Sequence, residues 1–159
     1  MPVLSCDVGS LPLAFEPALL ERGALDVLSP GRASSGAALL FKRAVISALK
    51  DKLSAGLDVP TYPQFRSMND MFLSMFYGIE ELEGRYVEVG HLGVRDARIP
   101  EVHVIEGGAK EIAEFLGLEK LRLRVCLTGP HTLSFCFAFR SPGLLARAPE
   151  GETEGEGVG

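Results

Sequence analysis

The sequence predicts an α/β fold in which helices separate short strands. Apolar residues recur at helical spacing in several stretches, and short apolar runs ending in Gly, Ser or Pro lie between those stretches. The predicted order is strand, helix, strand, helix, hairpin, helix, strand, helix. Strands separated by helices are typical of βαβ units, so a parallel sheet is expected.

Three short apolar segments, residues 3–10, 57–59 and 121–127, are predicted as strands of this sheet. Ligands collect at the carboxyl ends of parallel strands, so the residues that follow each segment are candidate binding residues. They are Gly9 and Ser10, Thr61 and Tyr62, and Thr128 and Gly129.

Four helices are predicted between and after these strands. Residues 37–55 carry one apolar stripe, and residues 109–116 repeat the same spacing before a glycine. Residues 67–77 carry methionines and phenylalanines at helical spacing, a pattern more typical of core than of a binding surface. Residues 132–140 are predicted to begin another helix.

An inserted β-hairpin is predicted over residues 85–105. Residues 85–89 and 101–105 are β-rich, and glycines and a proline lie between them. In the second of these strands Glu101 alternates with valines, so its side chain is expected on a solvent-exposed face.

The chain ends in an acidic tail, residues 149–159 (PEGETEGEGVG), which holds four Glu and no basic residue. Such a segment lacks apolar surface to bury, so it is predicted to be disordered; an acidic docking tail is the alternative. Residues 1–148 are predicted to form one domain.

Composition narrows the class of protein. The 159 residues have a net charge of −5, which disfavours a nucleic-acid binder. No apolar run reaches the roughly 18 residues of a membrane helix, and no signal peptide is visible, so no membrane partner is expected. The three cysteines are expected as reduced thiols in the cytoplasm.

A polar cluster follows the second predicted strand, and Gln64, Arg66, Asn69 and Asp70 are its candidate site residues. The Arg66 guanidinium suits a carboxylate or a phosphate, because its N–H groups form a fork. Asn69 or Asp70 could instead cap the helix that begins near Met68. Both roles stay open for these two residues.

A metal site is a further alternative. Cys126, His131 and Cys136 carry ligand atoms that suit zinc, but their spacing matches no established zinc pattern. Buried free cysteine is common, so packing is the favoured interpretation and no metal site is assigned to this chain.

Three stretches together resemble the cobalamin-independent methionine synthase family. Residues 7–12 (DVGSLP) are similar to its Gly-Ser-x-Pro motif after the first barrel strand. Residues 56–58 (GLD), followed by Arg66 and residues 69–71 (NDM), are similar to its second-strand motif. Residues 127–133 (LTGPHTL) are similar to its LTGPxT motif. The resemblance covers about residues 3–140.

The resemblance implies a (β/α)8 barrel in which zinc activates homocysteine for methyl transfer from a folate or a corrinoid protein. By motif position, Gly9, Ser10, Thr128 and Gly129 would line the substrate cavity. The family's substrate-binding Glu has no carboxylate counterpart here, because Pro63 or Gln64 stands at that position. The family's His-x-Cys zinc pair lies in the second half of its barrel.

A full barrel needs at least about 200 residues, so an incomplete (β/α)8 barrel of about half the strands is predicted. Its open edges would require a C-terminal half-barrel partner or a homo-oligomer, and the partner half would supply the zinc. Three hypotheses follow: a subunit of a split methyltransferase, a non-catalytic binding module of the same origin, and a self-sufficient enzyme using Cys126, His131 and Cys136.

Overall fold

The computed structural model describes residues 3–9, 11 and 16–137, and this part of the chain is mixed α/β, as predicted. Its regular structure consists of six helices and a two-stranded antiparallel sheet. The elements are α1 (Pro17–Leu28), α2 (Gly36–Ser54), α3 (Met68–Leu73), β1 (Phe76–Leu82), β2 (Arg85–Val94), α4 (Pro100–Gly107), α5 (Ala109–Phe115) and α6 (Pro130–Ser134). A regular parallel sheet is not found among these residues.

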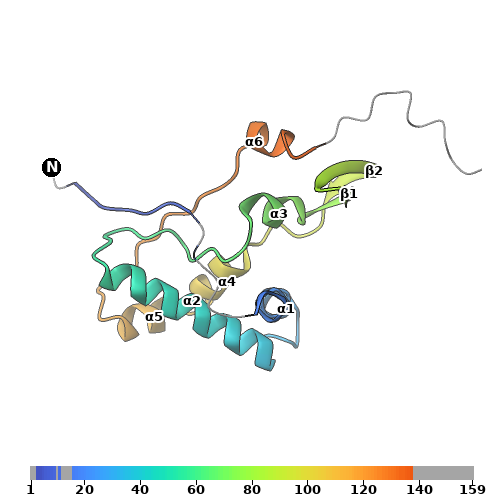
Figure 1. The fold of residues 1–159 in the computed structure, drawn as a ribbon. Helices are drawn as coiled ribbons and strands as arrows, with labels where there is room; N and C mark the ends of the chain where they lie inside the picture. The colour runs from blue at the N-terminus through green and yellow to red at the C-terminus, as the bar shows by residue number, and fades with distance from the viewer. Residues whose placement is uncertain (1–2, 10, 12–15, 138–159) are drawn as a thin grey trace, which may run out of the picture.

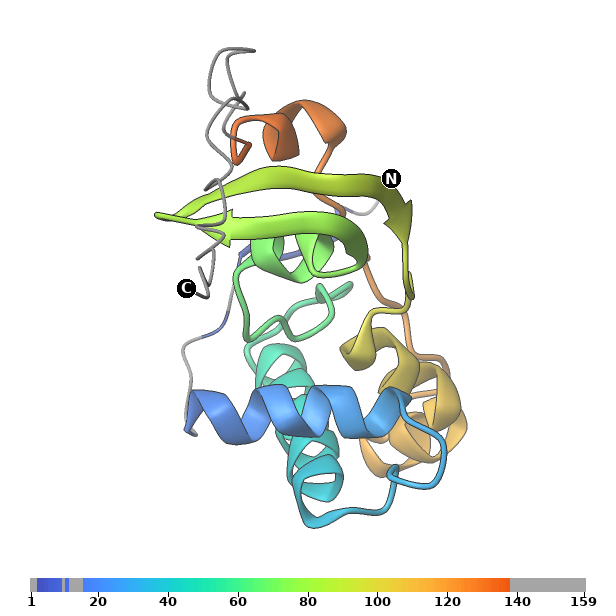
Figure 2. The ribbon, with the colours of Figure 1, turned by 90° about the vertical axis from the view of Figure 1, so that its right-hand side faces the viewer.

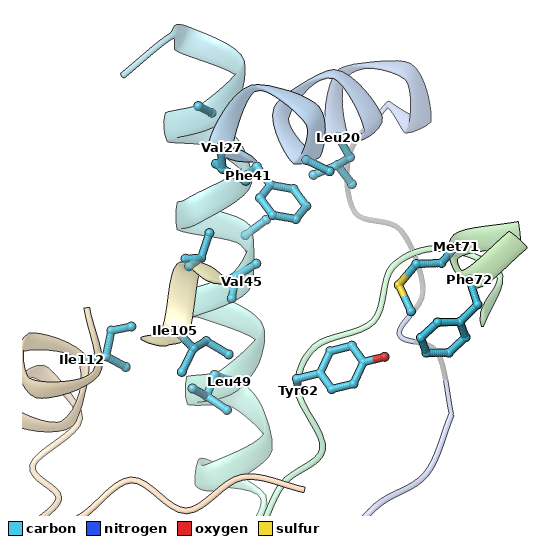
Figure 3. Packing of buried hydrophobic residues seen from close by; sticks show 14 residues of the cluster. Leu20, Val27, Phe41, Val45, Leu49, Tyr62, Met71, Phe72, Ile105 and Ile112 are labelled. Carbon is cyan, nitrogen blue, oxygen red and sulfur yellow. The ribbon is translucent and has the colours of Figure 1, made fainter. Parts of the chain in front are cut away.

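Helices α1, α2, α4 and α5 form what we call the helical layer (Figure 1). Helix α1 lies across α2, and α4 packs against both (Figure 2). Their apolar side chains meet in the main core, where Leu20 from α1 lies near Phe41 and Val45 from α2 (Figure 3). The crossing is close at Gly23, where a Cβ would overlap the carbonyl oxygen of Ala37.

Helix α2 confirms the predicted helix over 37–55, and α5 confirms the one over 109–116. Ser35 begins α2 as its N-cap: its hydroxyl accepts a 3.0 Å hydrogen bond from the Ala38 N–H and donates one of 2.7 Å to Asp26 on α1. Helix α1 itself is not among the predicted elements.

Residues 3–9, 57–64 and 121–127 run side by side as extended chain, and we call them the extended layer (Figure 1). The Val59 N–H donates to the backbone carbonyl oxygen of Ser5, and the Thr61 hydroxyl donates to that of Asp7. The first two segments are therefore parallel. Thr61 and Arg124 form a parallel bridge between the second and the third. The segments predicted as strands are therefore neighbours, but they do not form a regular ladder.

Proline and side-chain hydrogen bonds explain why the ladder is interrupted. Pro60 and Pro63 have no N–H to donate. The Thr61 N–H is taken by the Asp7 carboxylate at 2.7 Å, and the Ser5 N–H by the Asp58 carboxylate at 2.8 Å. Side chains thus replace several of the backbone bonds that a parallel sheet would contain.

The predicted hairpin over 85–105 is wrong in its extent. Strand β2 pairs instead with β1, and Glu83 and Gly84 turn between them with positive φ angles of 52° and 77°. Residues 101–105 lie in α4 because Pro100 occupies its first turn and the buried residues Glu101, Val104 and Ile105 follow helical spacing.

Two further elements differ from the prediction at their ends. The helix expected over 67–77 ends at Leu73, and Phe76 already begins β1. Helix α6 begins at Pro130 rather than at 132, and residues 138–140 lie outside the described part of the chain. The same holds for the acidic tail. None of the described helices is both long enough and apolar enough to cross a membrane.

Candidate functional site

The ends of the three extended segments lie close together, although the segments do not form the predicted parallel sheet. The Leu11 N–H donates a 2.8 Å hydrogen bond to the backbone carbonyl oxygen of Gln64, which brings the chain after Gly9 against the end of the second segment. The Tyr62 N–H donates to the Arg124 oxygen at 3.2 Å, and the Tyr62 hydroxyl donates to the Cys126 oxygen at 3.4 Å. Ser10 lies outside the described residues.

Gly9 and Gln64 each turn the chain at the end of an extended segment, Gly9 by its backbone conformation and Gln64 by a side-chain hydrogen bond. Gly9 has a φ of +114°, a conformation that side-chain-bearing residues rarely adopt, so its backbone turns where the first segment ends. Gln64 is buried, and its amide Nε2 donates a 3.1 Å hydrogen bond to the Arg66 oxygen. The amide thus fixes the turn that leads to Arg66.

Arg66 is held by a carboxylate from the helical layer. Its Nη2 lies 3.3 Å and 3.5 Å from the two carboxylate oxygens of Glu101, whose side chain is 0% exposed. The expectation that Glu101 faces solvent is therefore wrong, because α4 directs it into the interior. Burial raises the pKa of the Glu101 carboxyl, although the Arg66 guanidinium acts in the opposite direction.

Tyr62 lies at the centre of this region. Its ring belongs to the core, and its hydroxyl points towards the side chains of Met71 and Phe72 (Figure 3). Burial raises the pKa of Tyr62 to about 12, and the neighbouring Glu101 and Cys126 act in the same direction. Tyr62 is therefore a neutral hydrogen-bonding group at ordinary pH and is not suited to act as a base.

Asn69 and Asp70 lie in the first turn of α3. The alternative that one of them caps this helix is wrong, because Ser67 is the N-cap and its hydroxyl accepts from the Asp70 N–H at 3.4 Å. Asp70 is exposed and accepts a 3.1 Å hydrogen bond from the Tyr86 hydroxyl. Burial and this hydrogen bond raise the pKa of Tyr86 to about 12. The hairpin is thereby joined to α3 beside the site.

Thr128 and Gly129 follow the third segment and precede α6. The Thr128 hydroxyl oxygen is buried and has no hydrogen-bond partner among the described residues. Gly129 is exposed and stands at the N-cap position of α6. A ligand hydrogen bond to Thr128 would satisfy a buried polar group that is otherwise costly to leave unpaired.

The constellation of Cys126, His131 and Cys136 is not assembled. Both thiols are free, and the His131 ring contacts Phe135 with a centroid distance of 4.9 Å. Within the described ranges no three His, Cys, Asp or Glu side chains are gathered so that they could hold a metal ion. The structure therefore gives no support to the self-sufficient zinc enzyme.

The polar group that fixes the first segment is not among the residues predicted from the sequence. The Asp7 carboxylate lies 2.6 Å from the Nζ of buried Lys52, and Lys52 donates a further 3.0 Å hydrogen bond to the Thr61 oxygen. Burial alone would raise the pKa of the Asp7 carboxyl, but the bonds from Lys52 and Thr61 together hold it below its usual value. This group ties the extended layer to α2.

Comparison with protein-family models, with curated proteins and with solved structures gives no match to this chain. The resemblance to cobalamin-independent methionine synthases therefore depends on the three sequence motifs alone.

Proposed function

We propose that this chain supplies the homocysteine-binding part of a methionine-synthase-like methyltransferase whose barrel another polypeptide completes. One observation carries the proposal. The carboxyl ends of three parallel extended segments converge, and they bear Gly9, Gln64 and the stretch before Thr128 and Gly129. The motif resemblance assigns Gly9, Thr128 and Gly129 to the substrate cavity, and it places Pro63 or Gln64 at the position of the family's substrate-binding Glu.

The described side chains suit an amino-acid substrate. Arg66 contributes a guanidinium, a group whose geometry suits a carboxylate, and its side chain is 24% exposed while its Glu101 partner is fully buried. The Thr128 hydroxyl is a neutral group, buried and without a hydrogen-bond partner among the described residues, that a ligand could satisfy. Binding and orientation of the substrate are therefore the roles assigned to this chain.

Zinc does not fit the described residues, because they gather no set of metal ligands. Activation of the thiol is accordingly assigned to the completing half, and no step through the metal is derived for this chain.

The extended layer is open at both sides, which supports a completing partner. Within the described part, residues 3–9 and 121–127 pair with the central segment only. Large apolar side chains stand exposed on both, including Val8 at 72% and Leu127 at 69%. Open edges of this kind favour pairing with further strands, either from a half-barrel partner or from another copy of the chain.

A non-catalytic binding module is the second candidate. It is favoured by the same lack of a metal-ligand set among the described residues, since ligand binding needs only the convergent loops. The two candidates share the homocysteine site and differ in whether chemistry follows binding.

Native mass spectrometry of the tagged chain from its own cells, with homocysteine calorimetry on the recovered assembly, separates them. A stoichiometric zinc-bearing partner and methyl transfer to homocysteine would support the methyltransferase. A zinc-free homo-oligomer that binds homocysteine would support the binding module. An assembly that fails to bind homocysteine would overturn both.

Thr128→Val is the test variant and Thr132→Val its matched control, because the first removes the unpartnered hydroxyl and keeps the shape of the side chain. Thr128→Val should weaken homocysteine binding by about 1 kcal/mol or more, the scale of one buried hydrogen bond. Thr132→Val in α6 should leave the affinity unchanged. Equal affinities for the two variants would remove Thr128 from the site.

A further inference from the structure

The third extended segment presents a row of basic side chains that the proposed site does not use. Lys120, Arg122 and Arg124 occur at every second residue, and all three are exposed. Leu121 and Leu123 alternate with them and pack against the core. Over residues 120–124 the chain therefore places its two leucines against the core and its three basic side chains on the outer face.

This basic row has no acidic partner among the described residues. None of its members lies within 4.0 Å of a carboxylate there, and Arg124 makes one side-chain contact, from Nη1 to the Cys6 sulfur at 3.3 Å. The nearest acidic residue in sequence, Glu119, has the opposite parity. Asp58 on the neighbouring segment accepts hydrogen bonds from Ser5.

The acidic tail carries the complementary pattern, with a negatively charged residue at every second position. In the acidic tail, Glu150, Glu152, Glu154 and Glu156 also stand at every second residue, and no basic residue lies between them. In two extended chains, residues two apart are separated by about 6.5–7 Å on both sides. The two rows therefore carry opposite charges, and their charged residues have the same spacing when both chains are extended.

The tail is long enough to reach the basic row. Twelve residues, 138–149, separate Phe137 from Glu150, and an extended chain of that length spans about 40 Å. Arg124 and Phe137 are thirteen residues apart, and the chain between them contains the five residues of α6. The distance between them is therefore at most about 35 Å.

We propose that the acidic tail of this chain docks on the basic row formed by Lys120, Arg122 and Arg124, in extended form and glutamate to cation. Docked there, the tail covers the outer face of a segment whose free side is otherwise open to other strands. The inference is independent of the methyltransferase proposal.

Zero-length carbodiimide cross-linking of the full chain tests this, because it joins a carboxylate to a lysine amine only where the two are in contact. Lys110 on α5 is an exposed lysine outside the row and serves as the internal reference. At low ionic strength, cross-links from the tail to Lys120 should exceed those to Lys110 by about fivefold or more. High salt should abolish the excess.

The control variant Arg122→Gln/Arg124→Gln keeps both cross-linking groups and removes two charges from the row. The Lys120 yield should then fall to that of Lys110, with unchanged circular dichroism. Mixed heavy- and light-isotope chains show whether the tail docks on its own chain or on a second copy; a link between copies would overturn docking within one chain. Equal yields at the two lysines, or an excess that survives the double substitution, would overturn the proposal.

Discussion

The helical layer and the extended layer are stabilised in different ways. In the helical layer Phe41, Val45 and Leu49 are almost completely buried and pack against α1 and α4. In the extended layer Tyr62 of the central segment reaches the core, but Val8 and Leu127 of the outer segments are mostly exposed. The segments are joined by a few hydrogen bonds, and the ion pair between Asp7 and Lys52 ties the layer to α2. The core therefore lies mainly within the helical layer, whereas the outer segments of the extended layer expose large apolar side chains.

Truncation of one apolar side chain in each layer gives the largest expected contrast. Phe41 is 1% exposed, so Phe41→Ala should lower the free energy of unfolding by about 3–5 kcal/mol. Leu127→Ala should change it by less than about 0.5 kcal/mol, because the side chain already lies in water. Urea denaturation of the isolated chain measures both. Similar losses for the two variants would show that the extended layer is as well packed as the helical layer.

The helical layer was also the more predictable one. Helix α2 follows from its apolar stripe and from a serine cap, both of which are local features of the sequence. The three extended segments follow from short apolar runs, but their irregular pairing does not. That irregularity depends on Pro60 and on the contact between Asp7 and the Thr61 N–H, which joins residues 54 positions apart.

The candidate site could be predicted only in part, because some of its features are local in the sequence and others depend on distant contacts. The parallel arrangement of the three extended segments, which brings the chain after Gly9 to Gln64 and Tyr62 to Cys126, follows from the order of the segments in the sequence. The role of Glu101 does not, because period-two alternation over 101–105 obscured a helix. The signals available in the sequence were Pro100 at the start of the helix and the apolar residues Val104 and Ile105 three and four positions after Glu101.

A pair of glycine substitutions in the two strands extends the comparison to the hairpin. At Gly78, whose φ is +83°, a Cβ would overlap the backbone oxygen of His91, whereas at Gly90 it would meet open space. Gly78→Ala should therefore destabilise the hairpin by about 1–3 kcal/mol, because both the backbone conformation and the contact are unfavourable for a side chain. Gly90→Ala should have an effect within about 0.5 kcal/mol. Hydrogen exchange of the β1 and β2 amides reports the loss, and equal protection in both variants would contradict it.

The smallest expected effects distinguish the two layers by the sign of their pH dependence. Asp7 in the extended layer has a pKa below its usual value of 3.8, so its contribution to stability is present above that pH and is lost as pH falls through the lowered pKa. Glu101 in the helical layer has a pKa above its usual value of 4.5. Its contribution is full below about 4.5 and is lost as pH rises through the raised pKa.

Two amide substitutions separate these contributions. Asp7→Asn should remove part of the stability lost in acid, and Glu101→Gln should flatten the decline that begins above about pH 4.5, with stability at neutral pH equal to or above that of the native chain. Urea midpoints measured across the acid and neutral range give both profiles. A Glu101→Gln profile parallel to that of the native chain would mean that the Arg66 guanidinium fully offsets the burial of Glu101. The pair between α4 and the loop after the second segment would then stabilise the site as an ordinary ion pair, and Arg66 would have less charge to offer a ligand.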